Sequence, residues 1–167
     1  LILEGSGATI PPVASDARLC VAGAHQPLDY VVGYMGTYRL LISDAVVLAM
    51  AEEPLASREE VERLLDHIAQ MKPRMPVVPV VFRPRPLEAV EGRAVAFFCT
   101  APEVQLPVLT RHLEDHYGCC VRVASGNLAD RARLRADLAR ADMDEVDAVL
   151  TEIKAAAIDV VAEDADR

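Results

Sequence analysis

The start of the sequence holds its most suggestive chemical groups. It reads Leu-Ile-Leu-Glu-Gly-Ser-Gly, an apolar run that predicts a strand over residues 1–4 and ends on the carboxylate of Glu4. Parallel sheets bind ligands at the carboxyl ends of their strands, and a carboxylate there can hold Mg²⁺ directly or through water. Gly5, Ser6 and Gly7 follow, and glycines let the backbone approach a phosphate closely. The segment indicates a ligand site, with a plain turn after the strand as the alternative.

Basic side chains stand at other element ends. Arg83 and Arg85 alternate with prolines after an apolar strand, and Arg39 closes a stretch of glycines and hydroxyl residues. Lys154 falls in the first turn of an expected helix, where the helix dipole opposes a cation unless an anion is bound. Arginine suits bidentate recognition of phosphate or carboxylate. The alternatives are a solvated linker at Arg83 and Arg85, a helix with tolerated glycines before Arg39, and an exposed Lys154.

Two further groups of residues are weaker candidates for a functional site. Thr100 and Pro102 follow an expected strand, where a loop could frame a nucleotide base, but proline in the first turn of a helix needs no ligand. His112 and His116 are spaced to share one helix face, with two cysteines just beyond. This spacing matches no familiar zinc pattern, and a solvated helix face is the alternative to a metal site.

Short apolar runs alternate with longer amphipathic ones. Strands are expected at residues 1–4, 18–21, 45–50, 77–82, 94–100, 119–124 and 146–150. Helices are expected from a capping box at Ser57 to Pro73, and at 102–117, 128–140 and 151–163, while 30–42 is ambiguous. Buried-type strands alternating with helices indicate an α/β fold with a mainly parallel sheet covered on both faces.

Composition excludes several classes of protein. The 167 residues carry 17 Lys+Arg against 26 Asp+Glu, a net charge of −9, which argues against a general nucleic-acid binder. No apolar run reaches the ~18 residues of a membrane span. The 4 cysteines show no C-x-x-C spacing and fit buried thiols of a cytoplasmic protein. The chain opens on a strand-like run and closes on a crossover helix, so we expect part of a longer protein.

Taken together, the motifs resemble those of the cyclic 2,3-diphosphoglycerate synthetases. The resemblance is spread in order over nearly the whole chain. It rests on Leu3 to Val13, Gly33-Tyr34 through Leu41, Glu52-Glu53-Pro54, Phe82 to Leu87, Thr100-Ala101-Pro102, Ser125-Gly126-Asn127-Leu128 and Thr151 to Ala157.

The resemblance implies a P-loop NTPase-like core, akin to those of dethiobiotin synthetase and CTP synthetase, and an ATP-dependent ligase that uses Mg²⁺. Its reaction would close 2,3-diphosphoglycerate, a small phosphorylated metabolite, into cyclic 2,3-diphosphoglycerate. Glu4 would be catalytic and metal-binding, and Lys154 catalytic. The remaining implied contacts are to the nucleotide for Gly5, Ser6, Gly7, Arg83, Thr100 and Pro102, and to substrate phosphates for Arg39 and Arg85.

One departure from the family's pattern matters. No Gly-x-x-x-x-Gly-Lys-[Ser/Thr] motif occurs in the sequence, and in the family that loop lies upstream of the Glu-Gly-Ser-Gly segment. We therefore expect residues 1–167 to be the C-terminal part of the ligase core, inactive alone. The alternatives are another dethiobiotin synthetase-like ligase, or a nucleotide-binding or interaction domain without a P-loop. No nucleic-acid or membrane partner is expected, and a homo-oligomer is left open.

Overall fold

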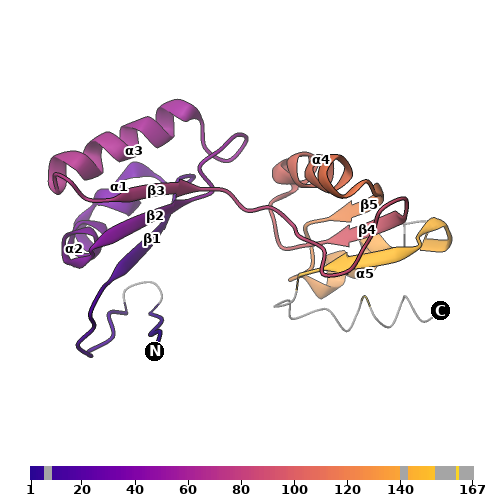
Figure 1. The fold of residues 1–167 in the computed structure, drawn as a ribbon, viewed down its shortest axis with the longest axis horizontal. Coiled ribbons are helices and arrows are strands. Elements are labelled where there is room, and N and C mark those ends of the chain that lie inside the picture. The colour runs from indigo at the N-terminus through magenta and orange to yellow at the C-terminus, as the bar shows by residue number, and fades with distance from the viewer. Residues whose placement is uncertain (6–8, 140–142, 153–160, 162–167) are drawn as a thin grey trace. The chain divides into compact units, whose positions relative to one another are not determined.

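The chain folds into two compact units, Leu1–Phe82 and Arg83–Arg167, in a computed structural model that describes residues 1–5, 9–139, 143–152 and 161. Each unit contains a three-stranded sheet with helices packed on it (Figure 1). Every described strand pairing is parallel. The α/β class with parallel strands is thus confirmed, although the strands form two sheets where the sequence suggested one.

The first unit runs β1–α1–α2–β2–α3–β3, and its sheet has the strand order β1-β2-β3. The bounds are Leu19–Gly23 for β1, Leu28–Val32 for α1, Tyr34–Ile42 for α2, Ala45–Ala49 for β2, Arg58–Met71 for α3 and Val77–Val80 for β3. Pro79, which removes one ladder donor, lies on the edge strand β3, where such a loss is tolerated.

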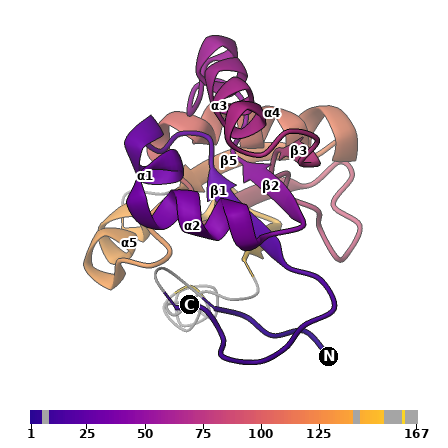
Figure 2. The ribbon, with the colours of Figure 1, turned by 90° about the vertical axis from the view of Figure 1, so that its left-hand side faces the viewer.

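All three helices of this unit pack on one face of its sheet. Val46 and Leu48 of β2 are fully buried against residues of α1, α2 and α3, and Figure 2 shows the helices grouped on one side of the strands. Side chains alternate between faces along a strand, so Leu19, Val21 and Val78 project from the other face. Each of these three is more than half exposed, so the described helices leave that face of the sheet uncovered.

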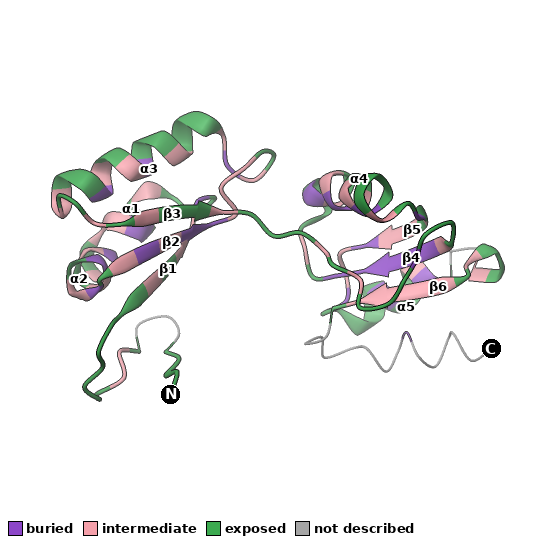
Figure 3. Cartoon of the chain, viewed as in Figure 1, coloured by how far each residue is buried: buried purple, intermediate pink, exposed green. Residues whose placement is uncertain are grey.

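Helix α3 begins where the sequence predicts it. The Ser57 hydroxyl accepts a hydrogen bond from the backbone N–H of Glu60, and the Glu60 carboxylate accepts one from the backbone N–H of Ser57, which completes the capping box. Leu64 and Ile68 are buried beneath it, while the outward face is exposed (Figure 3).

The ambiguous stretch 30–42 is two helices that meet at Gly33. A Cβ on Gly33 would collide with the carbonyl oxygen of Asp29, and one on Gly36 would collide with that of Val31. The two glycines therefore allow α1 and α2 to turn tightly against each other, which sets the relative positions of Tyr30 and Arg39.

The predicted strand over residues 1–4 is wrong. These residues adopt no regular structure, and Leu1, Ile2 and Leu3 are exposed. A strand forms only by hydrogen bonding to a neighbour, and none of the described strands pairs with this segment. An apolar run alone shows strand tendency but not the presence of a partner.

The second unit has the strand order β5-β4-β6 and a sheet that is covered on both faces. The bounds are Ala94–Phe98 for β4, Glu103–Gln105 for the 3₁₀ turn η1, Leu106–Tyr117 for α4, Cys120–Ser125 for β5, Arg131–Leu138 for α5, Met143–Glu145 for η2 and Ala148–Thr151 for β6. Helix α4 covers one face through Leu109 and Leu113, and α5 covers the other through Leu134 and Leu138.

Helix α4 ends at Gly118, which adopts the left-handed conformation (φ 63°) expected of a glycine cap. Val104 is 61% exposed because it lies in η1, before the α-helical spacing begins. All four cysteines are free. Cys99 and Cys119 are buried, but Cys20 is only half-buried and Cys120 is exposed, so the expectation of buried thiols is confirmed only in part. Among the described residues, no helix has the length and apolar character needed to span a membrane. The predicted helix over 151–163 lies almost wholly outside the described residues.

Candidate functional site

The second unit brings three strand ends together at one edge of its sheet. Phe98 of β4 is in register with Ser125 of β5 on one side and with Thr151 of β6 on the other. Thr100, Gly126 and Glu152 lie in the loops that follow these strands. Because parallel sheets bind ligands at their carboxyl edge, this edge is a candidate site.

Hydrogen bonds to Glu152 connect the loop after β4 to the end of β6. Its carboxylate accepts a hydrogen bond from the backbone N–H of Thr100 at 3.0 Å and another from the Thr100 hydroxyl at 2.8 Å. Both residues are exposed, so the pair lies at the surface of the edge. Pro102 is also exposed and precedes η1, whose Gln105 is buried.

The loop after β5 is held by a carboxylate from α5. Asp137 accepts hydrogen bonds from the Ser125 hydroxyl at 2.6 Å and from the Asn127 side-chain amide at 2.7 Å. The backbone N–H of Asn127 donates to the Ser125 hydroxyl. Between them, a Cβ on Gly126 would collide with the carbonyl oxygen of Ala101. Glycine thus lets the loops after β4 and β5 pack directly against each other.

The helices that follow β4 and β5 lie on opposite faces of the sheet, since α4 and α5 contribute to different cores. In open α/β sheets, ligands bind where neighbouring strands send their connections to opposite faces. That point lies between Thr100 and Ser125. The sequence singled out Thr100 and Pro102 as base contacts. Ser125, Asn127 and Glu152 stand in motifs that carry the family resemblance but were given no role, and Asp137 was missed. Glu152 directly after a strand was an available signal, whereas Asp137 lies in a helix and gave none.

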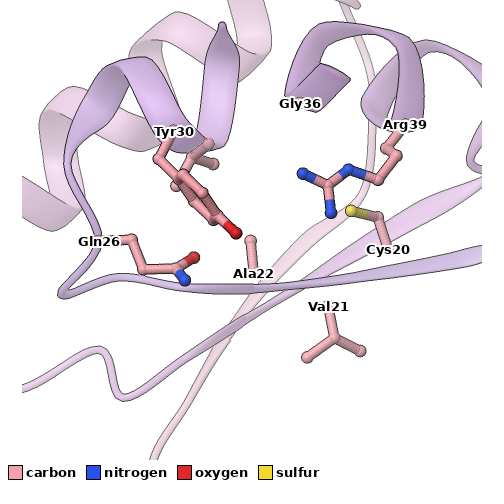
Figure 4. Close-up of a pocket in the computed structure, with 8 residues that line it drawn as sticks. Cys20, Val21, Ala22, Gln26, Tyr30, Gly36 and Arg39 are labelled. Atoms are coloured by element: carbon pink, nitrogen blue, oxygen red, sulfur yellow. The ribbon is translucent and has the colours of Figure 1, made fainter. Parts of the chain in front are cut away.

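The first unit contains a separate small pocket around Arg39 (Figure 4). Arg39 reaches it from α2 and is oriented by a hydrogen bond from its Nε to the Met35 carbonyl at 3.3 Å. Gln26 and Tyr30 approach from the opposite side, and Cys20 of β1 lies beside the guanidinium. The predicted role of Arg39 in anion binding therefore has a cavity to act in.

The pKa of the Cys20 thiol indicates the electrostatic environment of this pocket. Burial raises the pKa of the Cys20 thiol, and the positive charge of Arg39 acts in the opposite direction. A cation that stabilises a thiolate would also stabilise a bound anion, since both respond to the same field. Arg39 is thus close enough to the cavity to act on a negative charge inside it.

The other predicted site residues fall in different parts of the chain. Glu4 and Gly5 are exposed in the irregular segment before β1, and Ser6, Gly7 and Lys154 lie outside the described residues. Arg83 and Arg85 are exposed in the extended segment at the junction of the two units. Arg39 and Arg85 belong to different units, so their joint role in phosphate binding stays a prediction.

Histidines 112 and 116 stack with ring centroids 4.2 Å apart. Burial lowers the pKa of His112, and the nearby His116 and Arg83 lower it further. Within the described residues, no group of three or more His, Cys, Asp or Glu side chains is arranged to hold a metal. On α4, His112 is half-buried and His116 is exposed.

Two family models match the chain, and they divide it where the structure does. The P-loop domain of cyclic 2,3-diphosphoglycerate synthetase matches residues 1–81, and the C-terminal domain of cyclic 2,3-diphosphoglycerate synthetase matches residues 86–167. The two matches correspond to the two compact units, and the segment between them contains Arg83 and Arg85.

Curated relatives agree with this assignment. The cyclic 2,3-diphosphoglycerate synthetase of Rubrobacter xylanophilus is 55% identical over 160 residues, which is 96% of this chain and 36% of the relative. Those of Methanosphaera stadtmanae and Methanothermobacter thermautotrophicus are 38% and 41% identical over 98% and 99% of the chain, and 35% of each relative is covered. The chain thus spans about a third of the length of these relatives. With both domain models matched, it belongs to the cyclic 2,3-diphosphoglycerate synthetase family.

Proposed function

We propose that the chain is part of an enzyme that uses ATP to close 2,3-diphosphoglycerate into cyclic 2,3-diphosphoglycerate. The observation that carries the proposal is the match of two consecutive domains of one synthetase family to nearly all of the chain. ATP and 2,3-diphosphoglycerate would give the cyclic product, ADP and phosphate. The γ-phosphoryl group of ATP would pass to one substrate phosphate, and the neighbouring phosphate would then attack the activated phosphorus and release inorganic phosphate.

The protein's task in such a reaction is positioning and charge neutralisation. Two phosphates on adjacent carbons repel each other, so cations must hold them close enough for ring closure. Arg39, Arg85 and Lys154 are the proposed phosphate-holding residues, and Thr100, Pro102 and Arg83 the proposed nucleotide contacts. The charge balance of −9 does not oppose this, because a local cation acts over a short distance.

Mg²⁺ belongs to the proposal through Glu4. Protein sites for Mg²⁺ commonly use one or two carboxylates together with substrate phosphates and water. A single carboxylate beside Gly5, Ser6 and Gly7 fits that donor set, which needs no cluster of acidic side chains. Bound there, the ion would neutralise phosphate charge.

The test supplies ATP and 2,3-diphosphoglycerate and follows the cyclic product by ³¹P NMR. The sequence contains no Walker A motif, so we expect these 167 residues to need the remainder of a family-length protein, and both forms are assayed. Cyclic product from the family-length protein supports the proposal. ADP release with a carboxylate substrate instead would favour a dethiobiotin synthetase-like ligase. ATP binding without any turnover would favour a non-catalytic domain.

Residue roles are tested in the family-length protein. Arg85→Ala and Lys154→Ala should each raise the KM for 2,3-diphosphoglycerate or lower kcat, since each removes a charge-assisted contact worth about tenfold in affinity. Arg63→Ala, a change of equal charge on the exposed surface of α3, is the matched control. Unchanged KM and kcat in both variants would show that the two assignments are wrong.

A further inference from the structure

The pocket of the first unit combines one cation with several neutral hydrogen-bonding groups. The part of the chain that the structure describes lines it with eight residues, among them Arg39 and no carboxylate. The amide of Gln26 and the hydroxyl of Tyr30 face the guanidinium of Arg39 across the cavity (Figure 4). Val21 contributes only its backbone side, because its own side chain projects from the other face of β1.

Two of these groups are held in place by the local fold. The side-chain amide oxygen of Gln26 (Oε1) accepts a hydrogen bond from the backbone N–H of Gly23 at 3.3 Å, which turns the amide N–H groups away from the strand end. Gly36 permits the close contact between α1 and α2 that places Tyr30 and Arg39 on opposite sides of the cavity. The backbone thus sets the orientation of the Gln26 amide and the positions from which Tyr30 and Arg39 reach the cavity.

The size of the cavity restricts what it can hold. Its volume is about 190 Å³, below the roughly 300–1,000 Å³ of sites that enclose drug-sized ligands. The cavity is too small to enclose a whole nucleotide, whereas it can enclose a phosphate group on a short carbon chain. Three donors of different type can each meet a different oxygen of a phosphate, while a carboxylate offers only two oxygens.

We propose that this pocket binds one phosphate group of a small metabolite, with Arg39 supplying the charge and Gln26 and Tyr30 the neutral hydrogen bonds. The proposal deepens the function given above, on which it rests only for the identity of the metabolite. It adds Gln26 and Tyr30 as recognition residues.

Cys20 provides a readout that needs no turnover. The thiolate is the form that reacts with iodoacetamide, and Cys20 lines the pocket beside Arg39. A bound phosphate would block access to the thiol and offset the field of Arg39, and both effects slow labelling. Cys120, which is exposed and lies in the other unit, is the internal reference.

The experiment measures labelling of Cys20 and Cys120 by peptide mass spectrometry without ATP. Inorganic phosphate, 2,3-diphosphoglycerate and acetate are titrated separately at constant ionic strength, because salt itself screens charges. We expect phosphate and 2,3-diphosphoglycerate to slow the labelling of Cys20 until the effect saturates, and acetate to slow it only weakly. The labelling rate of Cys120 should stay constant. A stronger effect of 2,3-diphosphoglycerate than of phosphate would identify a metabolite subsite, and an equal effect a site for free phosphate.

Substitutions test whether Gln26, Tyr30 and Arg39 bind the phosphate. Gln26→Glu keeps an oxygen that can accept from Gly23 but adds a negative charge. The phosphate concentration that gives half-maximal protection of Cys20 should therefore rise by about tenfold or more. Tyr30→Phe should raise it several-fold, and Arg39→Ala should abolish the dependence on phosphate. Arg63→Ala should leave it unchanged. The change of rate with phosphate is compared, since removing Arg39 also alters the reactivity of Cys20.

The inference is overturned if neither phosphate nor 2,3-diphosphoglycerate slows the labelling of Cys20 relative to that of Cys120. It is also overturned if the labelling rate still depends on phosphate in Gln26→Glu and Arg39→Ala. Protection of Cys20 without formation of cyclic product in the family-length protein would refute the proposed function and leave the phosphate site standing. Formation of cyclic product without protection of Cys20 would support the proposed function and refute the phosphate site.

Discussion

Both oxygens of the Glu152 carboxylate hold Thr100, one through the backbone N–H at 3.0 Å and one through the hydroxyl at 2.8 Å. Glu152 follows β6 and Thr100 follows β4, which are neighbours in the sheet. The two hydrogen bonds therefore fix the relative position of two strand ends that ladder pairing alone would leave free beyond Thr151.

A double-mutant cycle on this pair should show coupling. Thr100→Val removes the hydroxyl and Glu152→Ala removes the acceptor, and each should lower the free energy of unfolding by about 0.5–1.5 kcal/mol. The double variant should lose less than the sum by about 0.5 kcal/mol or more. Urea unfolding followed by circular dichroism gives these values.

Thr110 is the matched control for this cycle. Its hydroxyl donates to the Pro107 carbonyl within α4 at 3.3 Å, away from Glu152 in sequence. Thr110→Val combined with Glu152→Ala should therefore be additive. Additivity in the Thr100 cycle as well would show that the hydrogen bonds to Glu152 contribute nothing to stability.

Most elements could be predicted from the sequence because their signals are local. The capping box at Ser57, the glycine end of α4 at Gly118 and the β-branched runs of the strands depend on neighbouring residues alone. The strand over residues 1–4 failed because pairing requires a partner, which sequence periodicity does not report. The division into two sheets also depends on distant contacts, since parallel strands are joined only by long connections.

The candidate sites were predictable only in part. Thr100 and Arg39 stand at element ends and could be singled out by position. Gln26 and Tyr30 lie in and beside a short helix without a distinctive motif, and only the packing of α1 against α2 brings them near Arg39. Asp137 reaches Ser125 from a helix twelve residues later, a contact that no local pattern encodes.

Gly126→Ala should destabilise the second unit. A Cβ at this position collides with the carbonyl oxygen of Ala101, so the loops after β4 and β5 must separate. We expect a loss of about 1–3 kcal/mol in the free energy of unfolding, measured by urea unfolding. Gly92→Asn is the control, because Gly92 has φ 71° with open space around it, and asparagine tolerates that conformation. Equal losses in the two variants would refute the close-packing argument.

Glu60→Gln should change stability in a pH-dependent way. Hydrogen bonds from the Ser57 backbone N–H, and then from its hydroxyl, lower the pKa of Glu60. The unfolded chain binds this proton more readily, so the contribution of Glu60 is fully present above the ordinary pKa of about 4.3 and is lost as pH falls through the depressed value. The difference in unfolding free energy between the protein and Glu60→Gln should therefore be constant above about pH 5 and shrink on acidification.

Glu59, the neighbouring carboxylate in the first turn of α3, provides the comparison. Glu59→Gln removes a charge favourable to the helix dipole but not the carboxylate of the capping box. Its effect should vary with acidification less than that of Glu60→Gln. The assignment fails if both variants give the same pH profile in urea unfolding.

The two faces of the first sheet should respond very differently to truncation. Leu48 is fully buried under the helices, whereas Val21 is 69% exposed on the other face. Leu48→Ala should lower the free energy of unfolding by about 2–5 kcal/mol, because it leaves a cavity among residues of α1 and α3. Val21→Ala should cost less than about 1 kcal/mol, since little apolar area returns to water. Urea unfolding of the 167-residue chain measures both. A large cost for Val21→Ala would mean that this face is covered in solution, and pairing between two copies of the chain would then appear as a concentration-dependent unfolding midpoint.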